Sequence, residues 1–565
     1  MKFLNIRQDA PKYDTVRAYV EEAVAKYSDH NAFILKESIE RSPYYLPITY
    51  RRFWEELRAF GAGLCHLGLQ GKRVALIGKN SYEWILSFLS VLCGVGVIVP
   101  LDKELPEKEL RLSLERSRAD AVIYDEEREH FFYGEKAIEN DNLRLRISTK
   151  KLRGDVQSVR DIMELGSLAL KREDLFDRYL PDPDEMAALL FTSGTTSASK
   201  AVMLSHRNIA TNLYDLMRVE TITSEDRNLV FLPLHHSFGS VGLTYFLCCG
   251  ATNMFCDGLR YVQKNLKEYR VTTFVGVPLL LEGMYRTLLR GIEKQGKTRL
   301  VSNAKKISRT LLKTGIDVRR KLFSAIHKEL GGSLRFIISG ASALDREVAE
   351  GFNELGILTV QGYGLTETSP VLSAENNEHM RTGSVGLPFP SVEITIDEPD
   401  ENGIGEICAK GGNVMLGYYE MPEETAAVLK DGVFHTGDLG YLDKDGFLYI
   451  TGRKKNVIVL KNGKNVYPEE LEEGLNRLPF VKESMVYAGE RDGARLIAAK
   501  IVYDEEYFKT RSEKSEKEKA SHMKAAVASF NETLPSYKHI KHLVFRTEPF
   551  IKTSTAKIRR HEEIN

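Results

Sequence analysis

The sequence predicts an α/β protein with a large N-terminal domain of layered sheets and helices and a small α+β C-terminal domain. Strand-like and helix-like segments alternate over most of the 565 residues, which is typical of parallel sheets covered by helices. The chain is also longer than a single hydrophobic core supports, so at least two domains are expected. The pattern changes after Lys454-Lys455-Asn456. We therefore predict domains at 1–454 and 455–565.

The alternation is clearest near the N-terminus, where apolar residues at helical spacing, such as Phe53, Leu57, Phe60 and Leu64, alternate with short apolar runs. The expected helices cover 15–27, 49–67, 83–92 and 107–118, and the expected strands cover 32–35, 48–50, 74–77, 95–99 and 121–124. Further strands are expected at 187–191, 230–232, 273–277 and 334–338. These later strands end in small or polar residues, where ligands bind in open α/β sheets.

The uncharged run at 84–101 has about the minimum length of a membrane span. Gly94, Gly96 and Pro100 interrupt it. We interpret it as a buried helix, a turn and a buried strand.

The composition gives no sign of a nucleic-acid partner. Lysine plus arginine and aspartate plus glutamate each number 79, so the net charge favours neither nucleic acid nor a membrane. The six cysteines form no C-x-x-C pair, which favours buried free thiols in a reducing compartment. The first residues lack the apolar core of a signal peptide. We therefore expect a cytoplasmic protein.

A loop rich in hydroxyl groups runs from Thr192 to Ser199 and is followed by Lys200. Its backbone N–H groups can close on an anion, Gly194 permits close approach, and the lysine adds positive charge. A phosphate group is the expected ligand. The loop is not a Walker A motif, because Ser199 and Ala201 stand where that motif needs a glycine and a hydroxyl. A flexible surface turn is the alternative.

A second motif, at 360–368, reads VQGYGLTET. Its glycines let the backbone approach a ligand, and the Tyr363 ring can stack on a flat base. Thr366 can donate a hydrogen bond to a phosphate, and Glu367 offers a hard oxygen ligand suited to Mg²⁺. The alternative is a glycine-rich turn with an incidental glutamate.

A third motif, Thr436-Gly437-Asp438, precedes an expected hairpin with its turn at Asp445-Gly446 and with Arg453 at its end. An aspartate can accept both hydroxyls of a ribose, and an arginine can reach sugar or phosphate. An ordinary hairpin with exposed charges is the alternative. Near the end of the chain, Lys557 stands in a run of small residues, and a mobile domain could deliver it to an anionic site.

The segment 283–328 reads as a basic helical insertion. About thirteen lysines and arginines face only two acids, Glu293 and Asp317. A basic amphipathic segment can lie on an anionic membrane surface, and Arg319-Arg320-Lys321 is its densest cluster. A solvated helical excursion is the alternative.

Together these motifs resemble the acyl-adenylate-forming (AMP-binding) superfamily over nearly the whole chain. The family pattern TSGTTGxPKG matches at 192–201 with substitutions, YGxTE at 363–367, TGD at 436–438 and GRxK at 452–455, and the terminal lysine motif matches loosely around Lys557. Any one motif is weak, but five in the family order are highly specific. The stretches LFSAIHKELGGSLRFIISGASAL, QGYGLTETSP and GRKKNVIVL are most similar to bacterial long-chain fatty acyl-CoA synthetases.

The resemblance implies a two-step reaction. A carboxylate attacks the α-phosphate of Mg·ATP, which gives an acyl-adenylate and pyrophosphate; the small mobile domain then swings, and coenzyme A takes the acyl group. The resemblance assigns Lys557 to the carboxylate and the α-phosphate, Thr366 to the α-phosphate, Glu367 to Mg²⁺ and His236 to the acyl site. It also assigns nucleotide binding to Thr192, Ser193, Gly194, Thr195, Thr196, Lys200, Gly340, Ala341, Ser342, Gln361, Gly362, Tyr363, Gly364, Asp438 and Arg453. His235 is expected to be structural or exposed.

The chain departs from the family pattern at five positions. Ser197, Ser199 and Ala201 stand where the family usually has Gly, Pro and Gly, Asn456 stands where the hinge is often Asp, and Ala556 replaces a Gly. Small residues are kept, so we expect the loops to survive and question only their flexibility.

The leading hypothesis is an ATP-dependent acid–thiol ligase for fatty acids, with no transmembrane span and with membrane contact through the basic insertion left open. Transfer to an acyl carrier protein, an aryl-acid substrate and an inactive nucleotide-binding homologue are the alternatives. A phosphate-binding NTPase is disfavoured by the failed Walker pattern.

Overall fold

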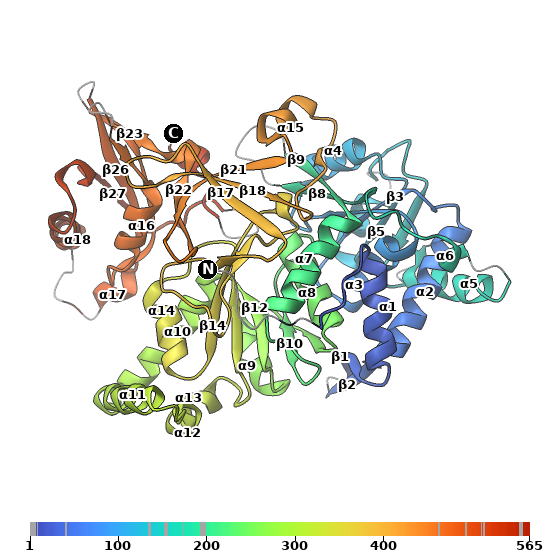
Figure 1. Cartoon of the computed structure of the whole chain (residues 1–565), viewed down its shortest axis with the longest axis horizontal. Coiled ribbons are helices and arrows are strands. Elements are labelled where there is room, and N and C mark those ends of the chain that lie inside the picture. Colours follow the sequence, from blue (N-terminus) through green and yellow to red (C-terminus); the bar gives the residue numbers. More distant parts are fainter. Residues whose placement is uncertain are drawn as a thin grey trace. The chain divides into compact units, whose positions relative to one another are not determined.

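The structure is a computed structural model that describes every residue except 1–6, 8, 40–41, 134–136, 152–155, 173–174, 193–198, 461–463, 492–493, 510, 512–514, 553–556 and 565. The chain forms two compact units (Figure 1). The large unit comprises Met1–Gly194, Ala198–Glu393 and Ala409–Phe434, and the small unit comprises Ile394–Cys408 and His435–Asn565. The predicted α/β class is confirmed. The predicted domain boundary between residues 454 and 455 stays a prediction.

The large unit contains two mainly parallel sheets. In spatial order, the first sheet consists of β16 (Leu387–Pro388), β15 (Ser373–Ala374), β14 (Leu358–Tyr363), β13 (Phe336–Ser339), β12 (Thr273–Gly276), β10 (Arg227–Val230), β11 (Thr252–Phe255), β1 (Asn31–Ile39) and β2 (Ser42–Thr49). The second consists of β19 (Gly417–Tyr418), β9 (Lys200–Ser205), β8 (Met186–Thr192), β4 (Val97–Leu101), β3 (Arg73–Ile77), β5 (Ala121–Tyr124), β6 (Leu145–Ser148) and β7 (Gln157–Ser158).

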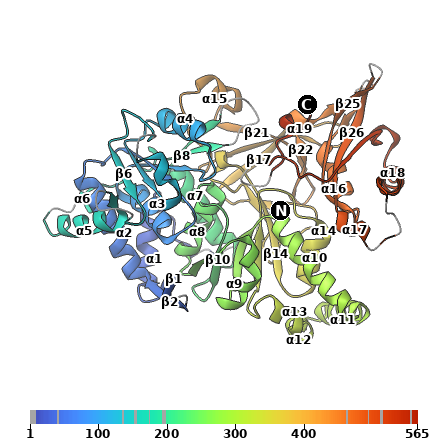
Figure 2. The same ribbon diagram turned by 180° about the vertical axis from the view of Figure 1, so that it is seen from behind.

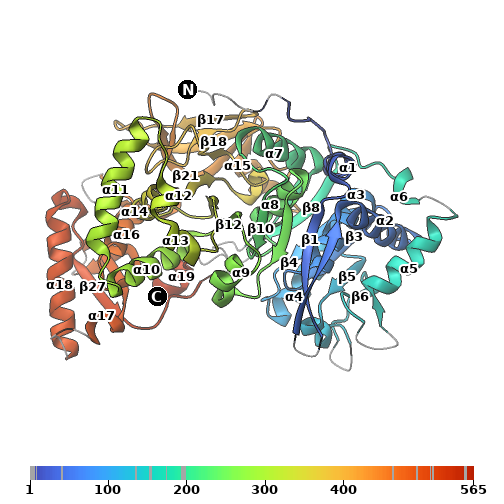
Figure 3. The same ribbon diagram turned by 90° about the horizontal axis from the view of Figure 1, so that it is seen from below.

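Helices cover these sheets, as the strand–helix alternation predicts. They are α1 (Val16–Tyr27), α2 (Tyr50–His66), α3 (Tyr82–Gly94), α4 (Glu107–Ser117), α5 (Val159–Ala169), α6 (Leu175–Arg178), α7 (His206–Val219), α8 (Ser237–Cys248), α9 (Val262–Glu268), α10 (Pro278–Lys294), α11 (Thr298–Lys313), α12 (Arg319–Leu322), α13 (Ser324–Glu329), α14 (Arg346–Glu354) and α15 (Pro422–Val428). Figure 3 shows α1, α2, α3 and α5 gathered beside β3, β5 and β6.

Helix α2 illustrates how the sequence pattern becomes packing. Thr49 caps its first turn by accepting a hydrogen bond from Arg52 N (3.2 Å). Phe53 and Leu57 are at most 1% exposed, and each fully buried side chain of this size contributes about 1.5–3 kcal/mol. A Cβ added at Gly166 of α5 would lie 1.8 Å from the Ala59 carbonyl oxygen of α2. The two helices therefore approach too closely for any side chain at that position.

The apolar run at 84–101 is not a span but α3 followed by the central strand β4, as predicted. No helix among the described residues is both long and apolar enough to cross a membrane. The strand begins at Val97, two residues later than expected. A Cβ at Gly96 would lie 2.2 Å from the Lys72 carbonyl oxygen, so this glycine marks the close turn between helix and strand.

Other predicted boundaries shift for local reasons. The strand expected at 230–232 is β10, which ends at Val230; Pro233 lacks an N–H and disfavours continued pairing. The strand expected at 334–338 is β13, which begins at Phe336. The segment expected to be a basic helical insertion forms α10 to α13, and Figure 2 shows α11, α12 and α13 at the lower edge of the view.

The small unit is α+β, as predicted for the C-terminal region. Its elements are β17 (Val392–Asp397), β18 (Gly405–Gly411), β21 (Val433–Leu442), β22 (Leu448–Arg453), β23 (Ile458–Val459), β24 (Asn465–Val466), α16 (Pro468–Asn476), β25 (Val481–Arg491), β26 (Ala494–Tyr503), α17 (Glu505–Lys509), α18 (Glu516–Glu532), β27 (His542–Arg546) and α19 (Arg560–Ile564). The strand β20 (Leu429–Lys430), the first residues of β17 and β21 and the last residues of β18 are counted in the large unit. Strands β25, β26 and β27 form one sheet. Leu471, Val486, Ile501 and Val527 form part of its core.

Candidate functional site

The stem of the expected phosphate loop is closed by strand pairing. Thr192 at the end of β8 pairs with Lys200 at the start of β9, and the Thr192 hydroxyl donates to the Lys200 carbonyl (3.2 Å). The Ser199 hydroxyl donates to the Thr192 carbonyl (2.6 Å), and Arg116 donates to the Ser199 carbonyl (2.6 Å). The predicted ligands Ser193, Gly194, Thr195 and Thr196 lie outside the described residues.

Two of the substituted loop positions have a structural role. Ser199, in place of proline, supplies the hydroxyl that closes the stem. Ala201, in place of glycine, is fully buried in a cluster with Ala75, Val99 and Leu189. Ser197 and Ala556 lie outside the described residues.

Tyr418 connects the loop stem to the second motif. Lys200 Nζ lies 4.3 Å from the centre of the Tyr418 ring, and the Tyr418 hydroxyl donates to Glu367 Oε1 (2.9 Å). Tyr418 itself is placed by β19, where it pairs with Val202 of β9. The structure therefore brings Lys200 and Glu367, separated in sequence, onto one aromatic ring. Sequence reasoning missed Tyr418, because a tyrosine after a glycine carries no distinctive signal.

Hydrogen bonds from neighbouring segments hold the turn that carries Thr366 and Glu367. Asn212 of α7 donates to the Val371 carbonyl (2.7 Å), and Asn413 donates to the Thr368 carbonyl (3.0 Å). Met415 N donates to the Glu367 carbonyl (2.9 Å). Such preorganisation lets a site act on a ligand without paying to order its own groups on binding.

The expected adenine loop is tied to β14. Gln361 accepts a hydrogen bond from Leu344 N (2.9 Å) through its side chain, which fixes the loop that contains Gly340, Ala341 and Ser342. Ala341 has φ of 72°, a left-handed conformation that is uncommon for a residue with a side chain, and such strained residues cluster at functional sites. Its neighbour Ser342 is exposed. The strain and the exposure are consistent with a loop that contacts a ligand.

Gly362, Tyr363 and Gly364 complete the second motif, and all three are half-buried. Gly362 and Tyr363 belong to β14, so these two residues do not form the glycine-rich turn that was the alternative interpretation. A Cβ at Gly364 would lie 1.8 Å from the Pro370 carbonyl oxygen. A side chain there is therefore incompatible with the fold of the motif.

Glu375 supports the same strand, because its carboxyl group accepts hydrogen bonds from Gln361 N (3.1 Å) and Arg381 N (2.9 Å). Burial raises the pKa of Glu375 to about 7, against the opposing effect of these two hydrogen bonds. The backbone N–H of Gln361 thus donates to a carboxyl group whose pKa lies near neutrality.

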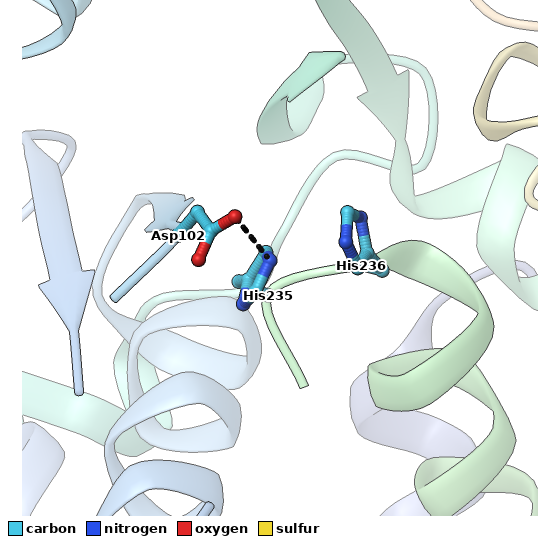
Figure 4. Close-up of side chains that lie close together, drawn as sticks. All are labelled: Asp102, His235 and His236. Carbon is cyan, nitrogen blue, oxygen red and sulfur yellow. Dashed lines mark ion pairs between the residues drawn. The ribbon is translucent and has the colours of Figure 1, made fainter. Parts of the chain in front are cut away.

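His235 and His236 have different surroundings (Figure 4). His235 is 9% exposed, and its Nε2 lies 3.4 Å from Asp102 Oδ2, directly after β4, so it is buried rather than exposed. His236 is half-buried and precedes the first turn of α8. The ring centres are 4.1 Å apart, and ligand-type atoms of Asp102, His235 and His236 lie within 4.8 Å of one another, a grouping that sequence spacing did not indicate.

Asp438 and Arg453 meet in the small unit. They are paired across β21 and β22, and Arg453 Nε lies 2.6 Å from Asp438 Oδ1. Asp438 is 4% exposed, so the arginine orients a nearly buried carboxylate. The expected turn at Asp445-Gly446 does join these two strands.

Glu406 supports this hairpin and was also missed by the sequence reasoning. Its carboxylate accepts hydrogen bonds from Gly437 N (3.0 Å) and Lys454 Nζ (2.7 Å). Burial alone would raise its pKa, but these hydrogen bonds hold the pKa of Glu406 below its ordinary value. One carboxylate thus connects the third motif to the residue after Arg453.

The remaining predicted residues also belong to the small unit. Lys557 is exposed and lies one residue before the bridge between Lys552 and Ile558. Asn456 donates to Glu469 Oε1 (2.6 Å). An aspartate at position 456 would place its carboxylate at that distance from the Glu469 carboxylate, and the two would repel each other. The asparagine makes a hydrogen bond there instead.

Comparisons with known proteins agree with the motifs. A family model described as "AMP-binding enzyme" matches residues 20–419, and one described as "AMP-binding enzyme C-terminal domain" matches residues 455–565. A long-chain-fatty-acid–CoA ligase of Escherichia coli O6:H1 is 29% identical, over 98% of this chain and 94% of that protein. A long-chain-fatty-acid–[acyl-carrier-protein] ligase, AEE15 of Arabidopsis thaliana, is 27% identical over 85% of this chain and 75% of that protein.

Solved structures share the fold. ATP-bound MatB from Rhodopseudomonas palustris has a TM-score of 0.76 at 23% identity, with 97% of this chain and 98% of that chain covered. The anthranilate CoA ligase AuaEII in complex with anthranoyl-AMP has a TM-score of 0.76 at 20% identity, with 98% of each chain covered.

The hairpin geometry generates a stability prediction. The buried Thr436 hydroxyl donates to the Ile407 carbonyl (2.7 Å) and accepts from Asp438 N (3.0 Å). Thr436→Val should therefore destabilise the protein by about 1–3 kcal/mol, measured by urea unfolding, because it leaves buried groups unpaired.

Thr451 on β22 is the matched control, because its buried hydroxyl has no hydrogen-bond partner among the described residues. Thr451→Val should be neutral or stabilising by up to about 1 kcal/mol. Equal losses in the two variants would contradict the role given to the Thr436 hydroxyl.

Proposed function

Because this chain belongs to the AMP-binding enzyme family, we propose that it is an ATP-dependent acid–thiol ligase that makes an acyl-adenylate and then an acyl-CoA. The observation that carries this proposal is the contact of Tyr418 with both Lys200 and Glu367. It places a positive charge beside the phosphate-loop stem and a fixed carboxylate beside Thr366, which is the charge arrangement that a polyphosphate needs.

The residues of the large unit fit ATP as follows. Thr192, Lys200 and the loop between them hold the phosphates, and Thr366 donates to the α-phosphate. Tyr363 and the strained Ala341 border the adenine. In the small unit, Asp438, oriented by Arg453, accepts hydrogen bonds from ribose hydroxyls.

Glu367 fits a Mg²⁺ ion that accompanies ATP. It is half-buried, and the Tyr418 hydroxyl fixes one of its oxygens. A hard carboxylate oxygen combined with substrate phosphates is the usual environment of Mg²⁺ in proteins. When bound, the ion supplies charge neutralisation for the phosphates.

Lys557 supplies the positive charge that lets two anions react. The attacking carboxylate and the α-phosphate repel each other, and an ammonium group about 4 Å from an anion contributes roughly 4 kcal/mol at an effective dielectric near 20. His236 lines the acyl site near the carboxylate. The exposed position of Lys557 on the small unit allows it to be delivered to the reacting groups by domain movement.

The test is pyrophosphate release from Mg·ATP by the purified protein, with fatty acids of increasing length and aryl acids, each with and without coenzyme A. Release that depends on an acid and becomes multiple-turnover with coenzyme A supports the ligase. Release limited to one turnover indicates another acceptor, such as a carrier protein, and no release despite ATP binding indicates an inactive homologue.

In the same assay, Lys557→Ala should lower adenylate formation about 10²–10³-fold, by comparison with the loss of one preorganised donor. Lys541→Ala, an exposed lysine of the same unit, is the control and should retain the wild-type rate. Wild-type adenylate formation by Lys557→Ala would refute its role.

For the acid, we propose a medium- or long-chain fatty acid. A small apolar cavity of about 20 Å³ lies between α8 and the strands β10 and β12. Its lining includes Phe231, Phe238, Gly242, Phe246 and Val275. These side chains suit an alkyl chain, and the helix that forms one wall begins directly after His236. The E. coli relative named for long-chain fatty acids supports this choice, whereas AEE15 and AuaEII keep a carrier protein and an aryl acid as alternatives.

Gly242 allows the cavity to be tested. A Cβ at this position would meet only Val275, at 4.0 Å, so an added methyl group enters the cavity without a close contact, and a valine fills more of it. Gly242→Val should lower kcat/KM for long-chain acids by about tenfold or more and leave short-chain acids nearly unchanged. Gly242→Ala should have a smaller effect. Equal losses for short and long acids would place the acyl chain elsewhere.

We also propose that α11 contacts an anionic membrane surface at the cytoplasmic face, from which a fatty acid can be collected. Leu300 and Ile307, spaced seven residues apart on one stripe of α11, are 66% and 57% exposed. The opposite side of the helix packs on α14, where Lys305 pairs with Glu354. An exposed apolar stripe beside basic side chains is the arrangement of interfacial helices.

The clustered basic residues are less suited to this role than the sequence suggested. Arg319 pairs with Asp317 (2.7 Å), and Arg320 donates to the Leu334 carbonyl (2.9 Å). Both guanidinium groups therefore stabilise the unit itself. Membrane binding is better tested with substitutions in α11.

Leu300→Ser combined with Ile307→Ser should weaken co-sedimentation with phosphatidylglycerol vesicles about tenfold in low salt, because apolar insertion is lost. Leu180→Ser, which changes another exposed leucine (75% exposed) of the large unit, is the control. If both variants bind vesicles like the wild type, α11 is only structural.

A further inference from the structure

A cluster of four potential metal ligands lies in the small unit, where three neighbouring strands meet. Asp397 ends β17, Glu406 and Cys408 belong to β18, and His435 belongs to β21. These strands are adjacent in the order β17-β18-β21. None of the four residues belongs to the set assigned to ATP, Mg²⁺ or the acid.

The distances within the cluster converge on one nitrogen atom. His435 Nδ1 lies 3.3 Å from Cys408 Sγ, 3.5 Å from Glu406 Oε2 and 3.8 Å from Asp397 Oδ2. The ligand atoms of Asp397, Cys408 and His435 all lie within 4.8 Å of one another. In a tetrahedral zinc site, bonds of about 2.0–2.3 Å imply ligand-to-ligand separations of roughly 3.3–3.6 Å. The nitrogen already has such separations from the sulfur and from Glu406, and the Asp397 oxygen is slightly farther away.

We propose that Asp397, Cys408 and His435, with Glu406 as the fourth ligand, bind a Zn²⁺-type transition-metal ion. This proposal does not depend on the ligase function. A thiolate and an imidazole select borderline or soft cations, whereas Mg²⁺ prefers oxygen ligands alone. When the metal binds, the Cys408 thiol loses its proton to solvent and the sulfur becomes an anionic ligand.

The framework around the cluster is rigid and accessible. Thr436, next to His435, donates to the carbonyl of Ile407, next to Cys408 (2.7 Å), so β18 and β21 are pinned beside the two central ligands. Cys408 is 2% exposed, but the Asp397 side chain is 46% exposed and gives the ion an entry path. Lys454 Nζ, 2.7 Å from Glu406 Oε2, is the competing cation and must release that oxygen. Bound metal would therefore act on the segment that carries Thr436, Gly437 and Asp438.

The experiment is titration of the full-length, metal-free protein under reducing conditions with Co²⁺, a spectroscopic substitute for Zn²⁺. We expect one equivalent to give a sulfur-to-cobalt charge-transfer band and the intense visible bands of tetrahedral cobalt. One equivalent of Zn²⁺ should abolish both, and excess Mg²⁺ should leave them unchanged. The absence of a charge-transfer band in the wild-type protein would overturn the proposal.

Single substitutions distinguish the loss of a metal ligand from misfolding of the protein. Cys408→Ser should lose the charge-transfer band, whereas Cys256→Ser, the control at the half-buried cysteine, should keep it. Asp397→Asn, at the exposed ligand, should keep the band but bind Co²⁺ at least tenfold more weakly while its circular dichroism matches the wild type. A band that persists in Cys408→Ser, or wild-type affinity in Asp397→Asn, would contradict the proposed ligand set.

Discussion

The organisation of the large unit's site depends on one aromatic ring. Tyr418 holds Lys200 by a cation–π contact and Glu367 by a hydrogen bond to its carboxylate. The first is worth about 0.5–2 kcal/mol and the second about 1.5–3 kcal/mol. Their larger effect is geometric, because a cation and an anion are held at two parts of the same side chain. A polyphosphate and its metal ion need both charges at once.

A buried carboxylate performs a comparable task in the small unit. Glu406 binds the backbone of Gly437 and the side chain of Lys454, and thereby connects the turn before Asp438 to the residue after Arg453. The ion pair between Asp438 and Arg453 is thus held at both of its strands. The same carboxylate faces His435, so any cation that draws on Glu406 also acts on this pair.

The sequence was sufficient for the features that local pattern determines. Periodicity located α2 and the helix–turn–strand at 84–101, and the motifs located Glu367, Asp438 and Arg453. It was insufficient where contacts form between distant segments. Strand pairing places Tyr418, Glu406 and Asp102, the partner of His235. No spacing in the local sequence predicts these contacts. Boundary errors such as that of β10 arose where one proline or glycine overrode an apolar run. The roles of the site residues themselves remain predictions, and part of the phosphate loop lies outside the described residues.

The departures from the family pattern raised the possibility of an inactive homologue, and the described positions argue against it. Ser199 closes the stem that a proline would have stiffened, Ala201 fills a core position, and Asn456 makes a hydrogen bond that an aspartate could not. Each change is accommodated by a specific partner, and Lys200, Glu367 and Arg453 keep their charges in place. The described substitutions therefore favour a working site over an inactive homologue.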